Sequence, residues 1–408
     1  MATRYFVGRA SRVAQVTSVV FSSVVATNTY SIAINGRSVS AVAGSTSLAD
    51  LVAALVEAWN TSAQAEHQEM VASEYFTAGP TLAGVQLTAR TAGVPSTVTA
   101  TASTGSATVT DQTAAAGPEF WKLAANWDGG TLPSGADDLV IENYSGNILY
   151  GLTDTLNYAS VKFRASFTGL VGLPDYNALG YTEYRTKRLT LGSGSAVAVE
   201  IGAGAGVGSG RIRLDTQTSN TTFTVHRSAN STTPGFPAVE LNNAGAGSVV
   251  RVYGGTVQVR ASTVATANVY RVQNNPESAL DLGTCTVTTL NCVGGTAYFE
   301  GTVTNVVARN AAVVTSGGAA TSANVTVSEN ARLNWNSSGG ITTMLTVQPG
   351  GTADFGQVAT AKTVAACQVF ADGQVLDPMG VVAWTAGVAL QGCRIGDVTV
   401  DLGVGYVL

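Results

Sequence analysis

Three Gly-Gly-Thr segments decide the fold that this sequence predicts: Val252–Val257 (VYGGTV), Cys292–Ala297 (CVGGTA) and Val347–Ala353 (VQPGGTA). Their glycine pairs begin at residues 254, 294 and 350. The gaps are close to multiples of about 20 residues, the lower end of known repeat periods. At the repeat positions that have no glycine pair, other turn-forming residues occur, namely Asn274–Pro276, Glu329–Asn330 and Asp372–Gly373. The expected turn positions are therefore Gly254, Gly255, Gly294, Gly295, Gly350 and Gly351.

Short alternating apolar segments flank these turns. Val325 and Val327 precede the turn at Glu329–Asn330, and Leu345 and Val347 occupy the equivalent positions 20 residues later. Such alternation is typical of strands, and a rung of this kind buries its inward side chains only by stacking on its neighbours. Glycine suits the corners because they often need φ > 0 and leave no room for Cβ. The pattern favours a right-handed parallel β-helix, with an antiparallel β-sandwich as the alternative.

Composition supports a mainly β protein and excludes some functions. The 408 residues indicate two domains, with three as the alternative. Charged residues make up 12% of the chain, and there are 46 glycines, which suits stacked strands better than helical bundles. A net charge of −5 without a basic stripe argues against nucleic-acid binding. No apolar run reaches the length of a membrane span, and no signal peptide is evident.

Residues 1–115 are predicted to form an α+β domain. A hairpin is expected around Asn35-Gly36. Ser47–Asn60 has apolar residues at helical spacing, with Ser47 as a capping residue. Strands are expected at 74–77, 85–89, 97–101 and 107–110, which together give one helix on one sheet.

This first quarter of the chain resembles a small domain of tailed-bacteriophage structural proteins. The resemblance is carried by Tyr30–Gly36 (YSIAING), the helix Leu48–Asn60, and Val85–Thr99 (VQLTARTAGVPSTVT). Ser96 stands where phenylalanine is common in that pattern. The resemblance implies a virion protein and leaves its place in the particle open.

A second segment marks the beginning of the solenoid. Residues 116–138 are interpreted as a linker and a cap, and residues 139–408 as the β-helix domain with a loop insert near 173–187. Asn126–Ile141 (NWDGGTLPSGADDLVI) is similar to the start of β-solenoid domains in phage and bacterial surface proteins. Trp121 and Trp127 are expected to close the open end of the first rung, where strand edges and core would otherwise be exposed.

The loop insert holds three tyrosines, Tyr176, Tyr181 and Tyr184. Aromatic residues gathered on a loop are typical of contact surfaces. The alternative is that they pack over the solenoid as a flap.

The sequence gives little sign of catalysis. Its two histidines, His67 and His226, lie in different domains, and no nucleophile motif surrounds a serine. Acid pairs on one solenoid face could cleave a glycan, but turn and cap roles are favoured for the candidates Asp354 (one period after Asn334), Asp372, Asp377, Asp137 and Asp138. The four cysteines, Cys285, Cys292, Cys367 and Cys393, form no metal-binding spacing. Buried free thiols are favoured, and disulfides stay open.

These observations predict a protein with no catalytic, cofactor or metal site. We expect a non-enzymatic structural protein of a tailed-phage virion, made in the host cytoplasm, with capsid decoration or cement as the leading position. The alternative is a tail, baseplate or fibre receptor-binding protein that contacts a host surface glycan. Its expected partners are other virion proteins and copies of itself in a homo-oligomer, most often a trimer, with no nucleic acid or membrane.

Overall fold

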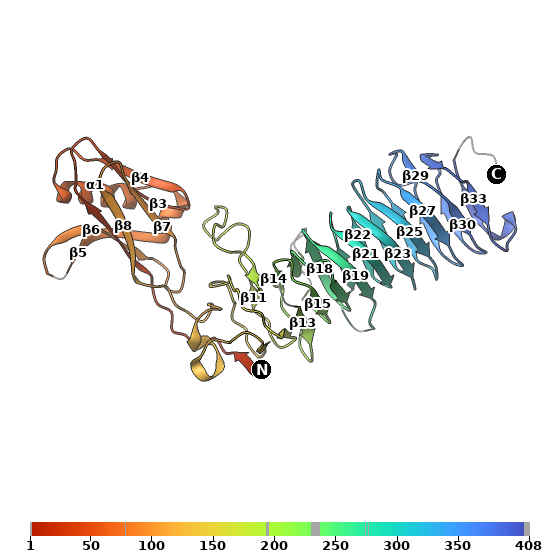
Figure 1. Ribbon diagram of the computed structural model, residues 1–408, viewed down its shortest axis with the longest axis horizontal. Coiled ribbons are helices and arrows are strands. Elements are labelled where there is room, and N and C mark those ends of the chain that lie inside the picture. The colour runs from red at the N-terminus through yellow and green to blue at the C-terminus, as the bar shows by residue number, and fades with distance from the viewer. Residues whose placement is uncertain are drawn as a thin grey trace.

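The computed structural model describes residues 2–77, 79–192, 196–229, 237–273, 275 and 277–403. It has two arms (Figure 1): an α+β domain and a long β-helix, whose rungs run from the middle of the chain to its C-terminal part. A loop between the arms rises from the first rungs of the β-helix. The mainly β architecture predicted from the sequence is confirmed.

Two parallel sheets form the β-helix over the described residues. The 15-stranded sheet 1 consists of β1 (Thr3–Phe6), β9 (Asp138–Ile141), β10 (Ser160–Arg164), β13 (Val197–Ala203), β15 (Thr221–Val225), β17 (Ser248–Val252), β19 (Thr263–Tyr270), β21 (Thr286–Val293), β23 (Thr302–Arg309), β25 (Thr321–Val327), β27 (Ile341–Val347), β29 (Lys362–Val364), β30 (Cys367–Val369), β32 (Val382–Trp384) and β33 (Val388–Leu390). The 12-stranded sheet 2 consists of β11 (Leu170–Val171), β12 (Leu189–Thr190), β14 (Arg211–Asp215), β16 (Val239–Asn242), β18 (Gly255–Arg260), β20 (Ser278–Asp281), β22 (Thr296–Phe299), β24 (Val313–Ser316), β26 (Arg332–Trp335), β28 (Thr352–Asp354), β31 (Gln374–Leu376) and β34 (Thr399–Asp401). Successive strands of the chain alternate between the sheets along most of the solenoid, so each rung supplies both.

The register explains the spacing of the glycine pairs. Paired positions on successive rungs of sheet 2 are Val257, Leu280, Ala297, Val314, Leu333 and Ala353. The first two glycine pairs are thus two rungs apart and the next two are three, as a period near 20 residues predicts. The β-sandwich alternative is wrong, because every described strand pair of the solenoid is parallel, whereas a sandwich of that kind is antiparallel.

In the core, residues at equivalent positions of successive rungs stack on one another and form ladders. One ladder on sheet 1 runs through Val252, Val269, Cys292, Ala308, Val327, Val347 and Val369, all of them 0% exposed. Burying a valine side chain contributes roughly 1.5–3 kcal/mol. Because each ladder residue is covered by the rungs above and below it, stability is a property of the stack.

The corners need glycine where the backbone turns with positive φ. Gly255 has φ +88°, and a Cβ there would lie 1.9 Å from Ser228 Oγ. Gly295 has φ +75°, and its Cβ would lie 2.6 Å from the Ser278 carbonyl oxygen. Gly254, Gly294, Gly350 and Gly351 lie at the same corner on their rungs. At the turns without a glycine pair, Asn330 and Asp372 adopt positive φ, which asparagine and aspartate tolerate better than most residues. Asn274 and Pro276 of the remaining expected turn lie outside the described residues.

Over its described residues, the α+β domain has one α-helix and two antiparallel sheets. Helix α1 (Leu48–Asn60) is capped by the Ser47 side chain, which accepts from the Asp50 amide. Asn35 and Gly36 form the predicted hairpin turn with φ +48° and +72°. The sheets are β5 (Met70–Phe76), β6 (Leu82–Ala89), β2 (Val16–Ser22) and β8 (Ser106–Thr113) in one, and β4 (Arg37–Val42), β3 (Thr29–Ile34) and β7 (Val98–Ala102) in the other. The expectation of a single sheet is therefore wrong.

The α+β domain is an insertion into the first rung of the β-helix. Strand β1 pairs in parallel with β9, with Phe6 beside Ile141. The two chain segments that lead into and out of the domain meet at an antiparallel bridge between Val13 and Ala116. The domain boundary expected at residues 1–115 needs this correction: residues 3–6 belong to the solenoid. A four-residue strand whose partner comes more than a hundred residues later leaves no local sequence signal.

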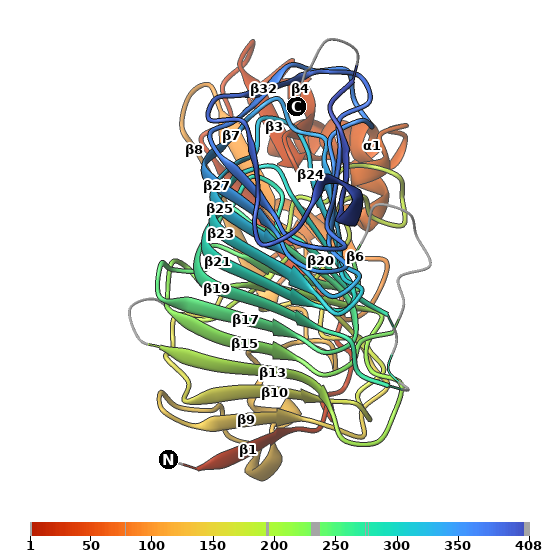
Figure 2. The same ribbon diagram turned by 90° about the vertical axis from the view of Figure 1, so that its right-hand side faces the viewer.

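Residues of the cap segment cover the end of the stack where β1 lies (Figure 2). Trp121 and Trp127 are each 1% exposed and pack against Phe6 of β1. The Trp127 indole donates to the Trp121 carbonyl, and the Trp121 indole donates to Asp154. The short 3₁₀ helices η2 (Ala124–Asn126) and η3 (Asp128–Gly130) flank Trp127. The aromatic cluster thus closes the apolar core at this end.

Candidate functional site at the domain junction

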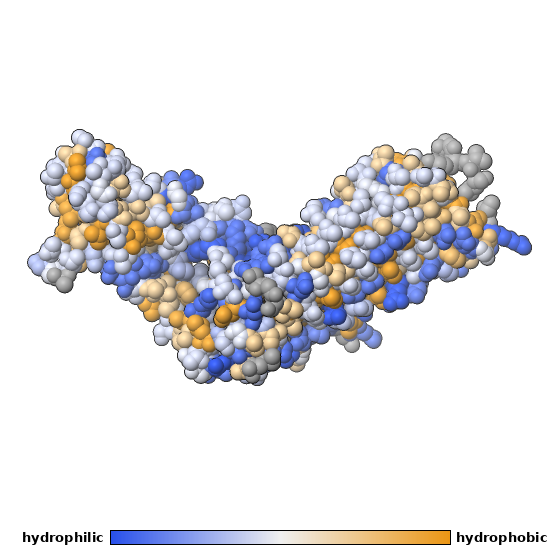
Figure 3. All heavy atoms as spheres, in the orientation of Figure 1, coloured by the Kyte–Doolittle hydropathy of each residue, from blue (hydrophilic) through white to orange (hydrophobic). Residues whose placement is uncertain are grey.

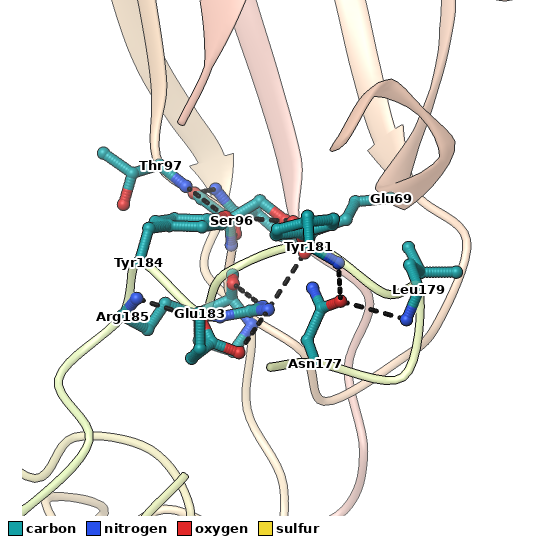
Figure 4. Close-up of polar contacts among 11 residues, drawn as sticks. Glu69, Ser96, Thr97, Asn177, Leu179, Tyr181, Glu183, Tyr184 and Arg185 are labelled. Carbon is teal, nitrogen blue, oxygen red and sulfur yellow. Dashed lines mark hydrogen bonds and ion pairs between the residues drawn. The ribbon is translucent and has the colours of Figure 1, made fainter. Parts of the chain in front are cut away.

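The loop insert at residues 173–187, here called the tyrosine loop, crosses from the β-helix to the α+β domain (Figure 4). There it contacts Glu69, the last residue of η1 (Ala65–Glu69). Tyr181 donates its hydroxyl hydrogen bond to Oε1 of Glu69, and Tyr184 donates to Oε2 at 2.9 Å. Ser96, from the α+β domain, donates to the same Oε2 at 2.7 Å. The loop therefore joins the two domains within one chain.

Arg185 is the cation of this junction. Its Nη2 lies 2.9 Å from Oε1 of Glu69, and its Nε lies 2.8 Å from Oε1 of Glu183. The three side chains are 12%, 6% and 1% exposed for Arg185, Glu69 and Glu183. The guanidinium also lies 4.9 Å from the Tyr184 ring centroid and donates to the Pro95 carbonyl. Burial alone would lower the pKa of Arg185, but the hydrogen bond to Glu183 and the charge of Glu69 raise it.

The three tyrosines predicted as a contact surface divide into two groups. Tyr181 and Tyr184 stack on each other and face the α+β domain. Burial, followed by the contact with Glu69, raises the pKa of both phenols. Tyr176 is 66% exposed and lies at an isolated antiparallel bridge with Thr182. The contact that Tyr181 and Tyr184 make with Glu69 is thus internal to the chain.

A cavity of about 520 Å³ lies beside the junction. Its walls include Tyr150, Leu173 and Asn177 from the solenoid side and Arg90 and Glu69 from the α+β domain. The space-filling view shows hydrophilic residues in the hollow between the two arms (Figure 3). Cavities of this size at domain interfaces are common ligand sites.

The geometry of Glu69 favours a fixed joint over acid–base chemistry. Both carboxylate oxygens already accept two bonds each, from Tyr181 and Arg185 on one side and from Tyr184 and Ser96 on the other. A general acid or base needs an oxygen within reach of a substrate proton. A buried carboxylate held by four donors instead fixes one arrangement, and removing a partner of such a pair costs about 3–5 kcal/mol.

The acidic residues suggested as glycan-cleaving candidates have structural partners. Asp354 lies beside Asn334 on the neighbouring rung, as expected, and pairs with Arg332. The side chain of Asp377 is fully buried and accepts from two backbone amides. Amide hydrogen bonds from Ser134 and Ala2 lower the pKa of Asp137 to about 2.

The remaining candidates are also occupied in the fold. Asp138 accepts from Ser160 on the next rung, and Asp372 is a turn residue with φ +60°. His67 contacts Ser62 and the Arg37 carbonyl in the α+β domain.

An aromatic ladder forms a second surface feature, on the outside of sheet 1. His226 stacks on Tyr253 with a centroid distance of 5.6 Å, and Tyr253 stacks on Tyr270 at 5.0 Å. The three half-buried rings occupy the same edge of successive rungs. His226 also lies 3.3 Å from Glu200.

The four cysteines are free, and Cys285, Cys292 and Cys367 are buried in the core. Burial raises the pKa of Cys292 and Cys367 to about 12. Within the described ranges, no three His, Cys, Asp or Glu side chains gather in a group that could hold a metal ion. Among the same residues, no helix has the length and apolar character of a membrane span.

Sequence reasoning found the tyrosines of the junction but missed Glu69 and Arg185. Glu69 is one glutamate in a short polar segment, and nothing local distinguishes it. A signal existed for Arg185: four charged residues lie within positions 183–188, in a chain that is 12% charged. Ser96, noted only as a departure from a phenylalanine pattern, is part of the same network.

Comparison with protein-family models, curated proteins and solved structures finds no match for this chain.

Proposed function

We propose that this chain is a non-enzymatic structural protein of a tailed-phage virion, with capsid decoration or cement as its leading position. The single observation that carries the structural role is the way the two arms are joined. The α+β domain is inserted in the first rung of the β-helix. A second connection is made by the contacts of Tyr181, Tyr184 and Arg185 with Glu69. Two covalent connections and a buried ionic contact suit a protein that holds other components at a fixed geometry.

The virion assignment rests on the resemblance carried by Tyr30–Gly36 and Val85–Thr99. In this proposal the α+β domain attaches to other virion proteins, and the β-helix projects or braces. The protein would be made in the host cytoplasm and act in the particle. Its chemistry would be that of repeated protein–protein contacts.

Mass spectrometry and cryo-electron microscopy of purified particles test the proposal. We expect the chain in washed particles at a fixed stoichiometry, with density for the β-helix on the capsid shell. Density at the tail would shift the assignment to a tail or baseplate protein. Absence of the chain from particles of a phage that encodes it would reject the virion role.

One observation favours a receptor-binding role as the second candidate. The ladder of His226, Tyr253 and Tyr270 offers an aromatic surface on the outer face of the solenoid, and aromatic side chains are common anchors in binding surfaces. A host glycan is the expected ligand in this case. Binding on a glycan array that is lost in Tyr253→Ala would support it, and an array without binding would remove it.

A further inference from the structure

On the outer face of sheet 1, the strands from β19 to β27 carry fewer charged residues than the strands before them. Strands β19, β21, β23, β25 and β27 contain one charged residue, Arg309, at the end of β23. We call the outward side of these five strands the uncharged face. Threonine and asparagine dominate it, and its most exposed members include Thr286, Thr288, Thr302, Thr304, Asn324 and Thr342.

The outer face of sheet 2 differs in charge along the same rungs. There Arg260 pairs with Asp281 of the next strand at 2.6 Å, and Arg332 pairs with Asp354. Burying such ion pairs carries a large desolvation cost. A partner that packs on the solenoid through a broad flat contact is therefore disfavoured on sheet 2. On the uncharged face the one charge of the five strands is Arg309, at the end of β23 and so at the edge of the contact.

Several polar groups of the uncharged face already have partners within the face. Asn324 donates to Asn305 at 2.9 Å, and Asn291 donates to Asn268 at 3.0 Å across neighbouring rungs. The hydroxyls of Thr302 and Thr321 lie 3.2 Å apart. A buried polar group is costly mainly when it has no hydrogen-bond partner, so this face can be covered at a modest cost.

The face has the size of a specific contact. Five strands about 4.8 Å apart and about seven residues long, with a rise of about 3.3 Å each, give roughly 550 Å² per copy. Two copies would bury on the order of 1,100 Å², which is above the ~1,000 Å² that a specific interface needs. Most of its side chains are short, which lets two sheets approach to the usual spacing of about 10 Å.

We infer that the uncharged face packs against the same face of other copies of this chain. A second copy presents strands at the same spacing, so the rungs of both copies can stay in register along the whole contact. Such a surface is self-complementary, as the interfaces of symmetric homo-oligomers are. The inference deepens the proposed structural role by naming its assembly contact, and it rests on that role only in expecting assembly.

Light scattering with size-exclusion chromatography, and sedimentation over a micromolar range, test the contact with the full chain. We expect a dimer, because a face that packs against the same face of a second copy makes a two-fold contact. The double variant Thr288→Lys/Thr342→Lys, with both changes on the uncharged face, should weaken association by at least tenfold. The matched control Thr296→Lys/Gln374→Lys puts the same charges on sheet 2 and should associate as the wild type does.

A cysteine variant reports the contact without added charge. Thr304→Cys in a Cys393→Ser background should form a covalent dimer under mild oxidation, whereas Gln374→Cys in the same background should not. A monomeric wild type, or an oligomer that the sheet 1 lysines leave intact, would overturn the inference. A monomer that is still found in particles would sink this contact alone, whereas an oligomer absent from particles would sink only the virion role.

Discussion

Glu69 and Arg185 are 116 residues apart in the sequence, and their side chains form a 2.9 Å ion pair where the α+β domain meets the β-helix. Each also contacts a tyrosine of the loop, Tyr181 or Tyr184. A contact of this kind fixes an orientation, because both charged groups are largely withdrawn from water and each needs the other.

Glu69→Ala should loosen the junction. Arg185 would keep Glu183 but lose its partner on the α+β domain, and Tyr181 and Tyr184 would lose their shared acceptor. We expect a loss of about 3–5 kcal/mol from this contact and a broader range of angles between the arms. Small-angle X-ray scattering of wild type and variant measures that range. Glu74→Ala, an exposed glutamate of the same domain, is the control, and identical scattering curves for wild type and Glu69→Ala would contradict a clamping role.

Trp121→Ala should destabilise the β-helix from its capped end. The side chain is 1% exposed and packs on Phe6 and Trp127. Tryptophan-to-alanine changes in a core cost about 3–5 kcal/mol. Urea unfolding followed by circular dichroism measures the loss. Leu132→Ala, an exposed residue of the same segment, should change little; equal effects of the two substitutions would show that the cap does not protect the core.

The β-helix could be predicted from the sequence because each repeat is marked by residues that are close to one another in the chain. Turn-forming residues at the corner (a glycine pair on some rungs, Asn330 or Asp372 on others) and small apolar residues on the inward side recur at a spacing near 20 residues, so the periodicity indicates the stack. The insertion of the α+β domain left no such trace, since the pairing of Phe6 with Ile141 depends on two short strands far apart. The junction was half visible: Tyr181 and Tyr184 are an unusual cluster in a loop, but their acceptor Glu69 is a single residue in another domain.

Asp137 should contribute stability at neutral pH that is lost in acid. Amide hydrogen bonds lower its pKa to about 2, compared with about 3.9 in an unfolded chain. A depressed carboxyl pKa stabilises the folded state above the unfolded value, and the contribution disappears as pH falls from about 4 to about 2. Melting temperatures of wild type and Asp137→Asn should therefore differ most near neutral pH and converge over that interval. A difference that is constant across the whole pH series would refute this assignment.

Cys393 should be the fast-reacting thiol of the native chain. It is partly exposed, whereas Cys285, Cys292 and Cys367 are buried and their pKa values are raised by burial. The thiolate is the reactive form, so an aromatic disulfide reagent should modify one thiol quickly and the other three only after unfolding. The fast phase should vanish in Cys393→Ser. More than one fast thiol in the folded wild type would mean that the core is open at Cys285, Cys292 or Cys367.

Gly295→Ala should destabilise the β-helix, because this corner combines two demands. Its φ of +75° costs an L-residue about 1–2 kcal/mol, and the new Cβ would lie 2.6 Å from the Ser278 carbonyl oxygen on the neighbouring rung. The rung must shift to relieve that clash, so the total loss should exceed the backbone strain alone. Gly44→Ala is the matched control, since its Cβ would meet no atom within 4 Å and its φ is not positive. Urea unfolding of both variants should show a lower midpoint for Gly295→Ala alone. Equal midpoints would mean that the stack absorbs a side chain at its corner, and that the spacing of the glycine pairs reflects something other than backbone geometry.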